Sequence, residues 1–324
     1  MKLLVTGGAG YVGSVVASQL VEAGHETVVL DDLSKGHADA VPNGAGFAEG
    51  SLLDEGFVRE TLSGGFDGVL HFAALSLVAE SMEQPGRYYR NNVVGTLNLL
   101  EAVVDAGVSR FVFSSTAAVY GEPDEVPIPE TAPTKPTNPY GSSKLAVDGL
   151  IRDVARARGL SATSLRYFNV AGASGRYGED HEPETHLIPI VLQAAAGTRE
   201  SVRIFGTDYP TRDGTAVRDY IHVKDLGRAH LLALEASGRG EHRVYNLGNG
   251  AGFSVLQVIE AARKVTGIDI TAEEAPRRAG DPPELVASSD RIKKELGWRP
   301  DKPELEAMIS DAWDWMKDHP GGYE

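Results

Sequence analysis

The 324 residues carry 46 acidic and 31 basic side chains, which gives a formal net charge of −15. This balance argues against a protein that coats nucleic-acid phosphates, which needs a basic face, although a few arginines in a cleft can still bind a small anion. The chain has no cysteine, so disulfides, zinc–thiolate sites and thiol nucleophiles are excluded. The apolar run before Gly7 is too short for a signal peptide, and no stretch approaches ~20 apolar residues, so we expect a cytoplasmic protein that spans no membrane.

The first half of the chain alternates short β-branched runs with helical stretches, which is the pattern of a parallel sheet covered by helices. The runs are almost continuously apolar, as expected of strands that are buried on both faces. We predict strands at Lys2–Thr6, Glu26–Leu30, Gly68–His71, Arg110–Ser114 and Ala162–Arg166. We predict helices at Tyr11–Ala23, Phe57–Leu62, Asn91–Ala106 and Tyr140–Arg158.

The regular alternation of predicted strands and helices ends after Arg166. Glycine, proline and charged residues crowd Gly172–Pro183, which predicts a loop, and a helix at Leu187–Ala196 and a strand at Val202–Phe205 follow. The sequence therefore predicts an α/β fold in two parts. Residues 1–168 form a doubly wound parallel sheet of the Rossmann type that binds a dinucleotide. Residues 169–324 form a smaller, mixed α/β substrate domain, some elements of which return to the first domain.

Three glycines directly after the first strand predict a dinucleotide site. Gly7, Gly10 and Gly13 stand at the mouth of the first helix, where the chain turns sharply and a pyrophosphate approaches the backbone and the free N–H groups of the helix. Alone, such a pattern is equally compatible with a tight turn. Asp31 ends the second strand, where a carboxylate accepts both ribose hydroxyls of NAD and repels the additional phosphate of NADP. Together these residues predict NAD as the cofactor.

A tyrosine followed four residues later by a lysine is the candidate catalytic pair. On a helix the two side chains share a face, and a nearby ammonium lowers the pKa of a phenol from its ordinary value near 10. The pattern occurs twice, at Tyr140/Lys144 and Tyr220/Lys224. Tyr140 follows a proline at the start of a predicted helix, whereas Tyr220 lies in the β-like run 217–223, where a spacing of four does not share a face. We therefore assign catalysis to Tyr140 and Lys144.

The hydroxyls that end the fourth predicted strand complete this constellation. Ser114, Ser115 and Thr116 stand where a side chain can hydrogen-bond the alcohol that is oxidised. Hydroxyl residues also cap strand ends routinely, so this interpretation depends on the tyrosine.

Nearly end to end, the chain resembles the UDP-glucose 4-epimerases. The resemblance is carried by VTGGAGYVGS, HFAA, NNVVGT, SSTAAVYG, NPYGSSKL, LRYFNVAGA, HLIP, the run from Phe205 through DYPTRDGTAVRDYIHV, YNLG and PRRAGDP. VRDYIHV and YNLG are far more specific than either the glycine pattern or the tyrosine–lysine pair.

The resemblance implies an NAD-dependent 4-epimerase that acts on UDP-sugars and forms a homodimer through residues 91–106 and 140–158. Thr116 orients the 4-hydroxyl, Tyr140 is the base and Lys144 lies beside it; hydride leaves C4, the 4-keto sugar rotates, and hydride returns to the other face. Cofactor contacts implied with the glycines, Tyr140 and Lys144 are Tyr11, Val12, Asp31, Leu52, Phe72, Ala73, Ala74, Ser76, Asn92 and Phe168. Substrate contacts implied with Thr116 and Tyr140 are Asn169, His186, Leu187, Phe205, Arg218, Arg278 and Asp281.

Four positions depart from the family pattern. Ser51 stands where many members have an aspartate near the adenine, and Ser76 replaces a lysine near the pyrophosphate. His186 replaces an asparagine of some members. Leu285 falls where a bulky tyrosine narrows the sugar pocket in some members, and this smaller residue predicts that UDP-N-acetylhexosamines are also accepted.

The segment Glu179–His186 contains acidic and histidine residues that suggest a metal site. The ligand spacing follows no strict metal motif, so we expect a solvated loop and no metal.

Three other functions share parts of this pattern. A nucleotide-sugar 4,6-dehydratase needs an Asp-Glu acid/base pair after the threonine, and here Ala117 and Ala118 follow Thr116. A dehydrogenase would release its reduced cofactor into solvent. A redox sensor that only binds NAD typically loses the tyrosine or the lysine, and this chain keeps both.

Overall fold

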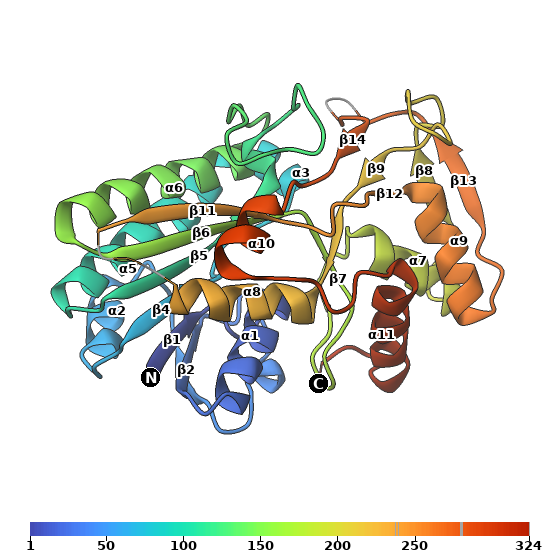
Figure 1. Cartoon of the computed structure of the whole chain (residues 1–324). Coiled ribbons are helices and arrows are strands. Elements are labelled where there is room, and N and C mark those ends of the chain that lie inside the picture. The colour runs from blue at the N-terminus through green and yellow to red at the C-terminus, as the bar shows by residue number, and fades with distance from the viewer. Residues whose placement is uncertain (237, 239, 279–280, 324) are drawn as a thin grey trace.

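The computed structural model describes residues 1–236, 238, 240–278 and 281–323. Its larger part is built on a seven-stranded sheet in the order β11-β6-β5-β4-β1-β2-β3, in which all pairings are parallel (Figure 1). Successive strands run outward from β1 in one direction and from β4 in the other, so the order reverses between these two neighbours. The strands are β1 (Lys2–Thr6), β2 (Glu26–Asp31), β3 (Gly46–Glu49), β4 (Gly68–His71), β5 (Arg110–Thr116), β6 (Ser161–Tyr167) and β11 (His242–Leu247).

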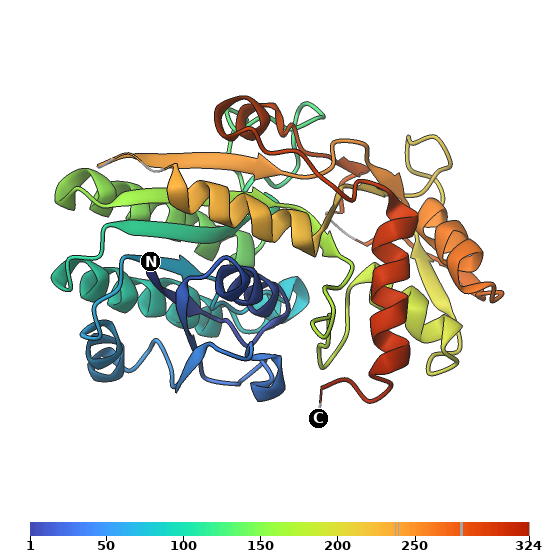
Figure 2. The ribbon, with the colours of Figure 1, turned by 60° about the horizontal axis from the view of Figure 1, so that its bottom comes forward.

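Helices cover both faces of this sheet, and in Figure 2 one helical layer lies in front of the strands and the other behind them. One apolar core joins the sheet to α2 (Glu55–Leu62), α5 (Gly95–Asp105) and α6 (Pro139–Arg158). A second core joins the opposite face to α1 (Tyr11–Glu22), α8 (Val223–Glu235) and α10 (Asp290–Leu296). Burial on both faces explains why the strand sequences are almost continuously apolar.

A third apolar core holds the smaller part together. It combines α7 (Leu187–Ala195), α9 (Val255–Thr266) and α11 (Leu305–Asp318) with strand β8 (Val202–Phe205). Short sheets complete this part: β7 (Asn169–Ala171) pairs β10 (Tyr220–His222), β8 pairs β13 (Ala272–Ala275), and β9 (Val217–Arg218) lies between β12 (Phe253–Ser254) and β14 (Glu284–Leu285). The chain crosses between the two parts more than once, because α8, β11 and α10 follow residue 168 in sequence yet pack on the first sheet.

The fold class is as predicted, and all five predicted strands occur in the large sheet. The helix predicted at Asn91–Ala106 is wrong at its start, because residues Tyr89–Val94 form a π-helical turn and α5 begins at Gly95. Two short helices, α3 (Val78–Glu83) and α4 (Pro85–Tyr88), precede this turn and were not predicted. Strand β3 was missed because it is a short edge strand whose residues are mostly exposed.

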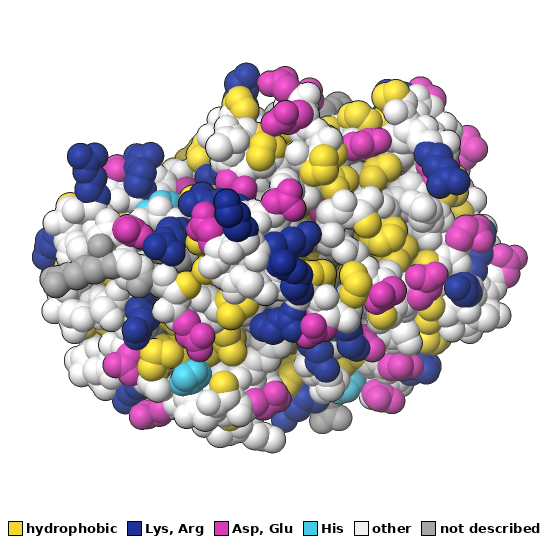
Figure 3. All heavy atoms as spheres, in the orientation of Figure 1, with side chains coloured by type: hydrophobic (Ala, Val, Ile, Leu, Met, Phe, Trp, Pro, Cys, Tyr) yellow, Lys and Arg dark blue, Asp and Glu magenta, His cyan; other side chains and the backbone are white. Residues whose placement is uncertain are grey.

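Among the described residues, no helix combines the length and the apolar character that a membrane crossing demands. On the face shown in Figure 3, acidic and basic side chains are interspersed over both parts of the molecule.

Candidate active site

The glycine loop between β1 and α1 has the shape that a pyrophosphate requires. Gly7 adopts a φ of +71°, and a Cβ at this position would lie 2.4 Å from the backbone nitrogen of Ala73. A Cβ on Gly13 would lie 2.1 Å from the Gly7 carbonyl oxygen, so only glycine lets the helix approach the strand this closely. Gly10 is the N-cap of α1 and makes no side-chain cap bond, which leaves the first N–H groups of the helix available to an anion.

Asp31 lies at the carboxyl end of β2, beside this loop, and is held by the backbone. Its Oδ2 accepts from the Ala9 N–H at 3.0 Å and its Oδ1 accepts from the Leu33 N–H at 2.9 Å. Burial raises the pKa of Asp31, while these hydrogen bonds lower it. Both carboxylate oxygens retain lone pairs, so the side chain is fixed in place and still able to accept hydroxyl groups.

One cavity at this edge of the sheet collects much of the predicted cofactor set. Eight of the predicted contacts line it: Gly7, Gly10, Asp31, Leu52, Phe72, Ala73, Ala74 and Ser76. Ser51 also lines it. The remaining predicted contacts are not in its lining: Tyr11, Val12, Gly13, Asn92, Tyr140, Lys144 and Phe168. An elongated cofactor that entered through this cavity would have to reach beyond it to meet the tyrosine and the lysine.

Thr116 and Tyr140 meet at the same edge of the sheet. Thr116 ends β5, and Tyr140 is the second residue of α6, whose N-cap Asn138 accepts from the Gly141 N–H at 2.8 Å. Burial raises the pKa of Tyr140, and a hydrogen bond from Thr116 lowers it. Thr116 Oγ1 in turn accepts from the Ala118 N–H at 3.2 Å, which leaves its hydroxyl proton for the phenol or for a substrate.

Lys144 is buried on the next turn of α6. Its Nζ donates to the Ser114 carbonyl oxygen at 2.8 Å and lies 4.7 Å from the centre of the Phe113 ring. Burial lowers the pKa of Lys144 to about 7, against an opposing effect of Asp148. The expected lowering of the Tyr140 pKa by this ammonium is absent, because the pKa of the phenol is shifted only by burial and by Thr116. Position along one helix face therefore does not by itself pair the two groups.

The other tyrosine–lysine pair is divided between two elements. Tyr220 lies on β10, and Lys224 lies on α8, which begins at Val223. Tyr220 is buried in the core of the smaller part. The prediction that residues 217–223 are β-like is confirmed except at Asp219, which separates β9 from β10, and at Val223, which begins α8.

The predicted substrate residues fall on the smaller part and include a basic group. Arg218 pairs with Asp281, and its Nη1 donates to the Val217 carbonyl oxygen at 2.7 Å. The Arg278 guanidinium lies 3.9 Å from the centre of the Phe205 ring. Asn169 Nδ2 donates to the carbonyl oxygen of Asp219, the residue after Arg218, at 3.1 Å. His186 and Leu187 stand at the N-terminus of α7. A planar cation over a ring and a second arginine nearby suit a uracil base and a diphosphate.

Two buried polar residues that organise the site were not predicted in that role. Asp219 accepts from the N–H groups of Asn249 at 2.7 Å, Gly250 at 3.0 Å and Ala287 at 3.0 Å, and so joins two segments of the chain behind Arg218. Asn92 was predicted as a cofactor contact, but its side-chain amide is already hydrogen-bonded within the protein. Its Oδ1 accepts from the Leu75 N–H at 2.9 Å, and its Nδ2 donates to the Leu75 carbonyl oxygen at 3.0 Å and to Ser143 Oγ at 3.0 Å. It braces a cavity-lining loop against α6. The motifs VRDYIHV and NNVVGT contained both residues, but their partners are set by the fold.

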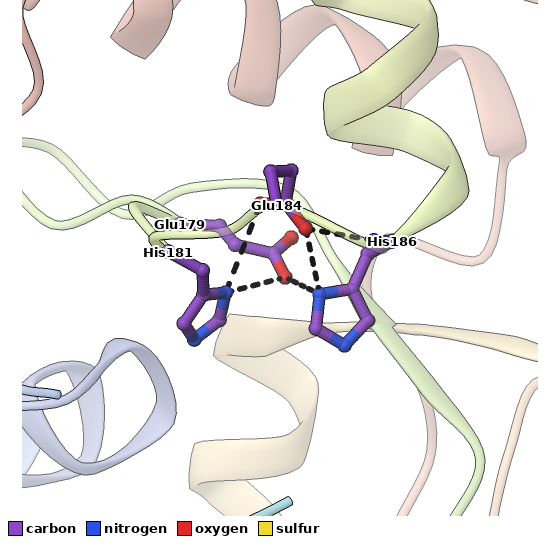
Figure 4. Close-up of side chains that lie close together, drawn as sticks. All are labelled: Glu179, His181, Glu184 and His186. Atoms are coloured by element: carbon purple, nitrogen blue, oxygen red, sulfur yellow. Dashed lines mark hydrogen bonds and ion pairs between the residues drawn. The ribbon is translucent and has the colours of Figure 1, made fainter. Parts of the chain in front are cut away.

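The segment Glu179–His186 differs from the solvated loop that we expected. The carboxylate side chains of Glu179 and Glu184 are 9% and 5% exposed, and both pair with His181 and His186 (Figure 4). Burial lowers the pKa of each histidine, but the carboxylates outweigh it and raise the pKa of His181 to about 9 and that of His186 to about 11. Burial raises the pKa of Glu184, but the histidines lower it to about 2.

Comparison with known proteins identifies the class. Residues 3–248 match the family model described as the NAD dependent epimerase/dehydratase family. The chain belongs to this family. A UDP-glucose 4-epimerase of Corynebacterium glutamicum is 59% identical over 314 residues, which cover 97% of this chain and 95% of that protein.

Solved structures agree with this similarity. A crystal structure of a UDP-glucose 4-epimerase is 50% identical, with a TM-score of 0.97 over 100% of both chains. The UDP-glucose 4-epimerase of Bifidobacterium longum in complex with NAD+ and UDP is 36% identical, with a TM-score of 0.94 over 100% of both chains. Within its family, this chain is therefore similar to the UDP-glucose 4-epimerases over its whole length.

Proposed function

We propose that the chain interconverts UDP-glucose and UDP-galactose by transient oxidation at C4, rotation of the 4-keto sugar and return of the hydride to its other face. One observation carries the proposal: Thr116, whose side chain lowers the pKa of Tyr140, ends β5 next to the strand that leads into the cofactor cavity. Ligands of open α/β sheets bind at this end of the strands.

The residues of the cavity fit NAD. The space above Gly7 is kept free by the missing Cβ, the start of α1 offers N–H donors, and Asp31 presents a fixed acceptor. NAD, when bound, supplies the acceptor for the C4 hydride and later returns it. A carboxylate at the ribose position supports NAD over NADP.

Proton transfer is assigned to Tyr140. Its phenolate oxygen accepts the proton of the 4-hydroxyl during oxidation and returns it after rotation, with Thr116 orienting the hydroxyl. Lys144, whose Nζ is bonded to the Ser114 carbonyl oxygen, does not lower the pKa of Tyr140 in the chain alone. The stabilisation of the phenolate is therefore assigned to Lys144 together with the positive nicotinamide ring that NAD supplies when bound. Arg218 and Arg278 anchor the diphosphate end on the other part of the molecule, which lets the sugar turn without escaping.

The turnover of UDP-galactose tests this assignment. We expect Tyr140→Phe to lose about 10²–10⁴-fold in rate and to keep its bound NAD, because the substitution removes only the hydroxyl. UDP-glucose must form without added NAD, which separates an epimerase from a dehydrogenase that releases its cofactor. Near-normal turnover in Tyr140→Phe would remove the proposed base, and bound NAD without any turnover in the parent chain would support a sensor instead.

The sugar specificity is proposed to extend to UDP-N-acetylhexosamines. Leu285 lies on β14 and packs with Phe168 against a small apolar cluster, and a leucine occupies less of a sugar pocket than a tyrosine. The assay is the epimerisation of UDP-N-acetylglucosamine by the parent chain and by Leu285→Tyr. We expect the variant to lose this activity while it keeps UDP-galactose turnover; equal loss of both would show that Leu285 does not select the sugar.

We further propose a cytoplasmic homodimer that forms through the π-helical turn, α5 and α6. Large apolar side chains are exposed before this turn, along it and at the start of α5: Val78, Met82, Tyr89, Val94 and Leu97. Such side chains gather at dimer interfaces. Sedimentation of the parent chain and of Leu97→Asp tests the proposal, which predicts a dimer for the first and a shift towards monomer for the second.

A further inference from the structure

The loop between β7 and α7 brings four side chains of metal-binding type together. Glu179, His181, Glu184 and His186 each direct one ligand atom inward, and the four atoms all lie within 4.8 Å of one another (Figure 4). From this convergence we propose that the four side chains bind one divalent transition-metal ion of the Zn²⁺ type. The site is distinct from the catalytic pair and does not depend on the proposed reaction.

The spacing of the ligand atoms suits a tetrahedral ion. Bonds of ~2.0–2.1 Å to nitrogen and oxygen place neighbouring ligand atoms about 3.3 Å apart. His186 Nδ1 lies 2.8 Å from Glu179 Oε1 and 2.9 Å from Glu184 Oε1. His181 Nδ1 lies 3.3 Å from Glu179 Oε1 and 3.7 Å from Glu184 Oε2. These four separations lie within about half an ångström of the tetrahedral value. They use both oxygens of Glu184, and one set of four ligand atoms extends to 4.8 Å, so an ion would draw the side chains closer together.

His181 provides an independent indication of a missing ligand. Its Nδ1 is buried and, within the part of the chain that the structure describes, has no well-aligned hydrogen-bond partner. The two carboxylate contacts at 3.3 and 3.7 Å are ion pairs without hydrogen-bond geometry. A buried polar atom of this kind normally has a partner, and Figure 4 shows the atom directed at the two carboxylates.

The charges around the cluster balance a divalent ion. Among the described residues, every ion pair given for Glu179 and Glu184 is with one of the two histidines, and none is with a lysine or arginine. Without an ion the two histidines carry this balance as imidazolium groups. A divalent cation that displaces both protons leaves two neutral imidazoles and two carboxylates, again with no net charge. Buried carboxylates need such compensation.

The donor set selects the kind of metal. Mg²⁺ and Ca²⁺ prefer ligand sets made of oxygen alone. Imidazole nitrogen is a good ligand of Zn²⁺ and of its neighbours in the first transition row. Two nitrogens and two carboxylate oxygens from a single loop match a closed, structural zinc site more closely than an oxygen cage.

The position of the loop assigns the ion a bracing role over the cofactor cavity. His181, Glu182 and Pro183 line that cavity. Lys35, from the other part of the molecule, donates from its Nζ to the Glu182 carbonyl oxygen at 2.7 Å. Asp180 is hydrogen-bonded from two sides. His37 Nε2 lies 3.2 Å from its carbonyl oxygen, and the Tyr323 N–H donates to its carboxylate at 2.9 Å. An ion at the centre of this loop would fix the edge of the cavity.

Metal titration of the purified chain tests the site. After chelator treatment and its removal, the chain is titrated with Zn²⁺ by calorimetry, and with Mg²⁺ in parallel. We expect one Zn²⁺ per chain, no Mg²⁺ binding at the same concentrations, and a rise in Tm of about 4 °C at a hundredfold excess over Kd. His181→Gln is expected to weaken Zn²⁺ binding by about 100-fold or more, whereas the matched variant His25→Gln, at a histidine far from the loop in sequence, keeps it.

Visible absorption of the Co²⁺-loaded chain gives a second readout, because tetrahedral Co²⁺ absorbs far more strongly than octahedral Co²⁺. The intense tetrahedral spectrum is expected for the parent chain and for His25→Gln, and its loss for Glu184→Gln. Absence of stoichiometric Zn²⁺ binding to the parent chain overturns the proposal whether or not the variants fold. Equal weakening by His25→Gln and His181→Gln also overturns it, since binding would then be distributed over surface histidines.

Discussion

Replacing Lys144 by methionine is expected to stabilise the folded chain while it removes catalysis. The residue is 3% exposed, and burial lowers its pKa from 10.5 to about 7. The unfolded chain keeps the ordinary pKa, so between pH 7 and pH 10.5 it binds more protons than the folded chain does. The stability of the parent chain therefore rises with pH between pH 7 and pH 10.5. Below pH 7 the full free-energy cost of burying the lysine is present.

The size of the effect follows from the difference between the two pKa values. At ~1.4 kcal/mol per unit, burial of the lysine costs roughly 4 kcal/mol at pH 7 and roughly 2 kcal/mol at pH 9. Methionine fills a similar volume and titrates at neither pH. It loses the hydrogen bond to the Ser114 carbonyl oxygen, which reduces the gain by about 1 kcal/mol. The expected net stabilisation is about 3 kcal/mol at pH 7 and about 1 kcal/mol at pH 9.

Urea denaturation of the parent chain and Lys144→Met at pH 7 and pH 9 measures this difference. Lys135→Met, at an exposed lysine, is the control and should differ from the parent equally at both pH values. UDP-galactose turnover of Lys144→Met should fall by about 10²-fold or more. A stabilisation that does not change with pH, or a variant less stable than the parent at pH 7, would refute the account of Lys144 as a functional residue that costs stability.

Three further outcomes follow from the geometry. Gly13→Ala should lower the free energy of unfolding by about 1–3 kcal/mol in urea denaturation, because the new Cβ would lie 2.1 Å from the Gly7 carbonyl oxygen. Gly10→Ala is the control: its Cβ would lie 3.5 Å from the same oxygen, so the stability should be almost unchanged. Asp31→Asn should reduce the preference for NAD over NADP by about tenfold in cofactor-binding titrations, since a neutral amide no longer repels the additional phosphate; an unchanged ratio would contradict that role. Asp219→Ala should cost about 3 kcal/mol or more in the same denaturation assay, because three backbone N–H groups lose their acceptor, and a loss under 1 kcal/mol would show that the loops hold without it.

The large sheet could be predicted because its signals are local. Strands such as Gly68–His71 are recognisable as apolar runs of the right length, and the predicted bounds agree with β4. Strand β11 was not predicted, because its place beside β6 depends on a chain crossing that no local pattern encodes. The π-helical turn at Tyr89–Val94 was missed for a similar reason: its residues read as ordinary helix.

The candidate site divides in the same way. Gly7, Gly13 and Asp31 could be predicted individually, because each meets a demand of its own backbone position. The position of Lys144 relative to the phenol could not, since the Ser114 carbonyl oxygen that holds it comes from another element. The sequence suggested a metal site at Glu179–His186, and we expected a solvated loop instead because the spacing follows no metal motif; only the folded loop brings these side chains together.

Rotation of the sugar places opposite demands on the two parts of the molecule. Proton transfer by Tyr140 needs a fixed geometry, which α6 and β5 provide through the Thr116 hydrogen bond. Arg218 and Arg278, which we propose as anchors of the diphosphate, are carried by the smaller part, whose core is separate. The distance between anchor and base then depends on the contacts that join the two parts, among them those of Lys35 with the loop at Glu182. Because this loop also lines the cofactor cavity, a change at the junction is expected to alter the distance between anchor and base together with the edge of that cavity.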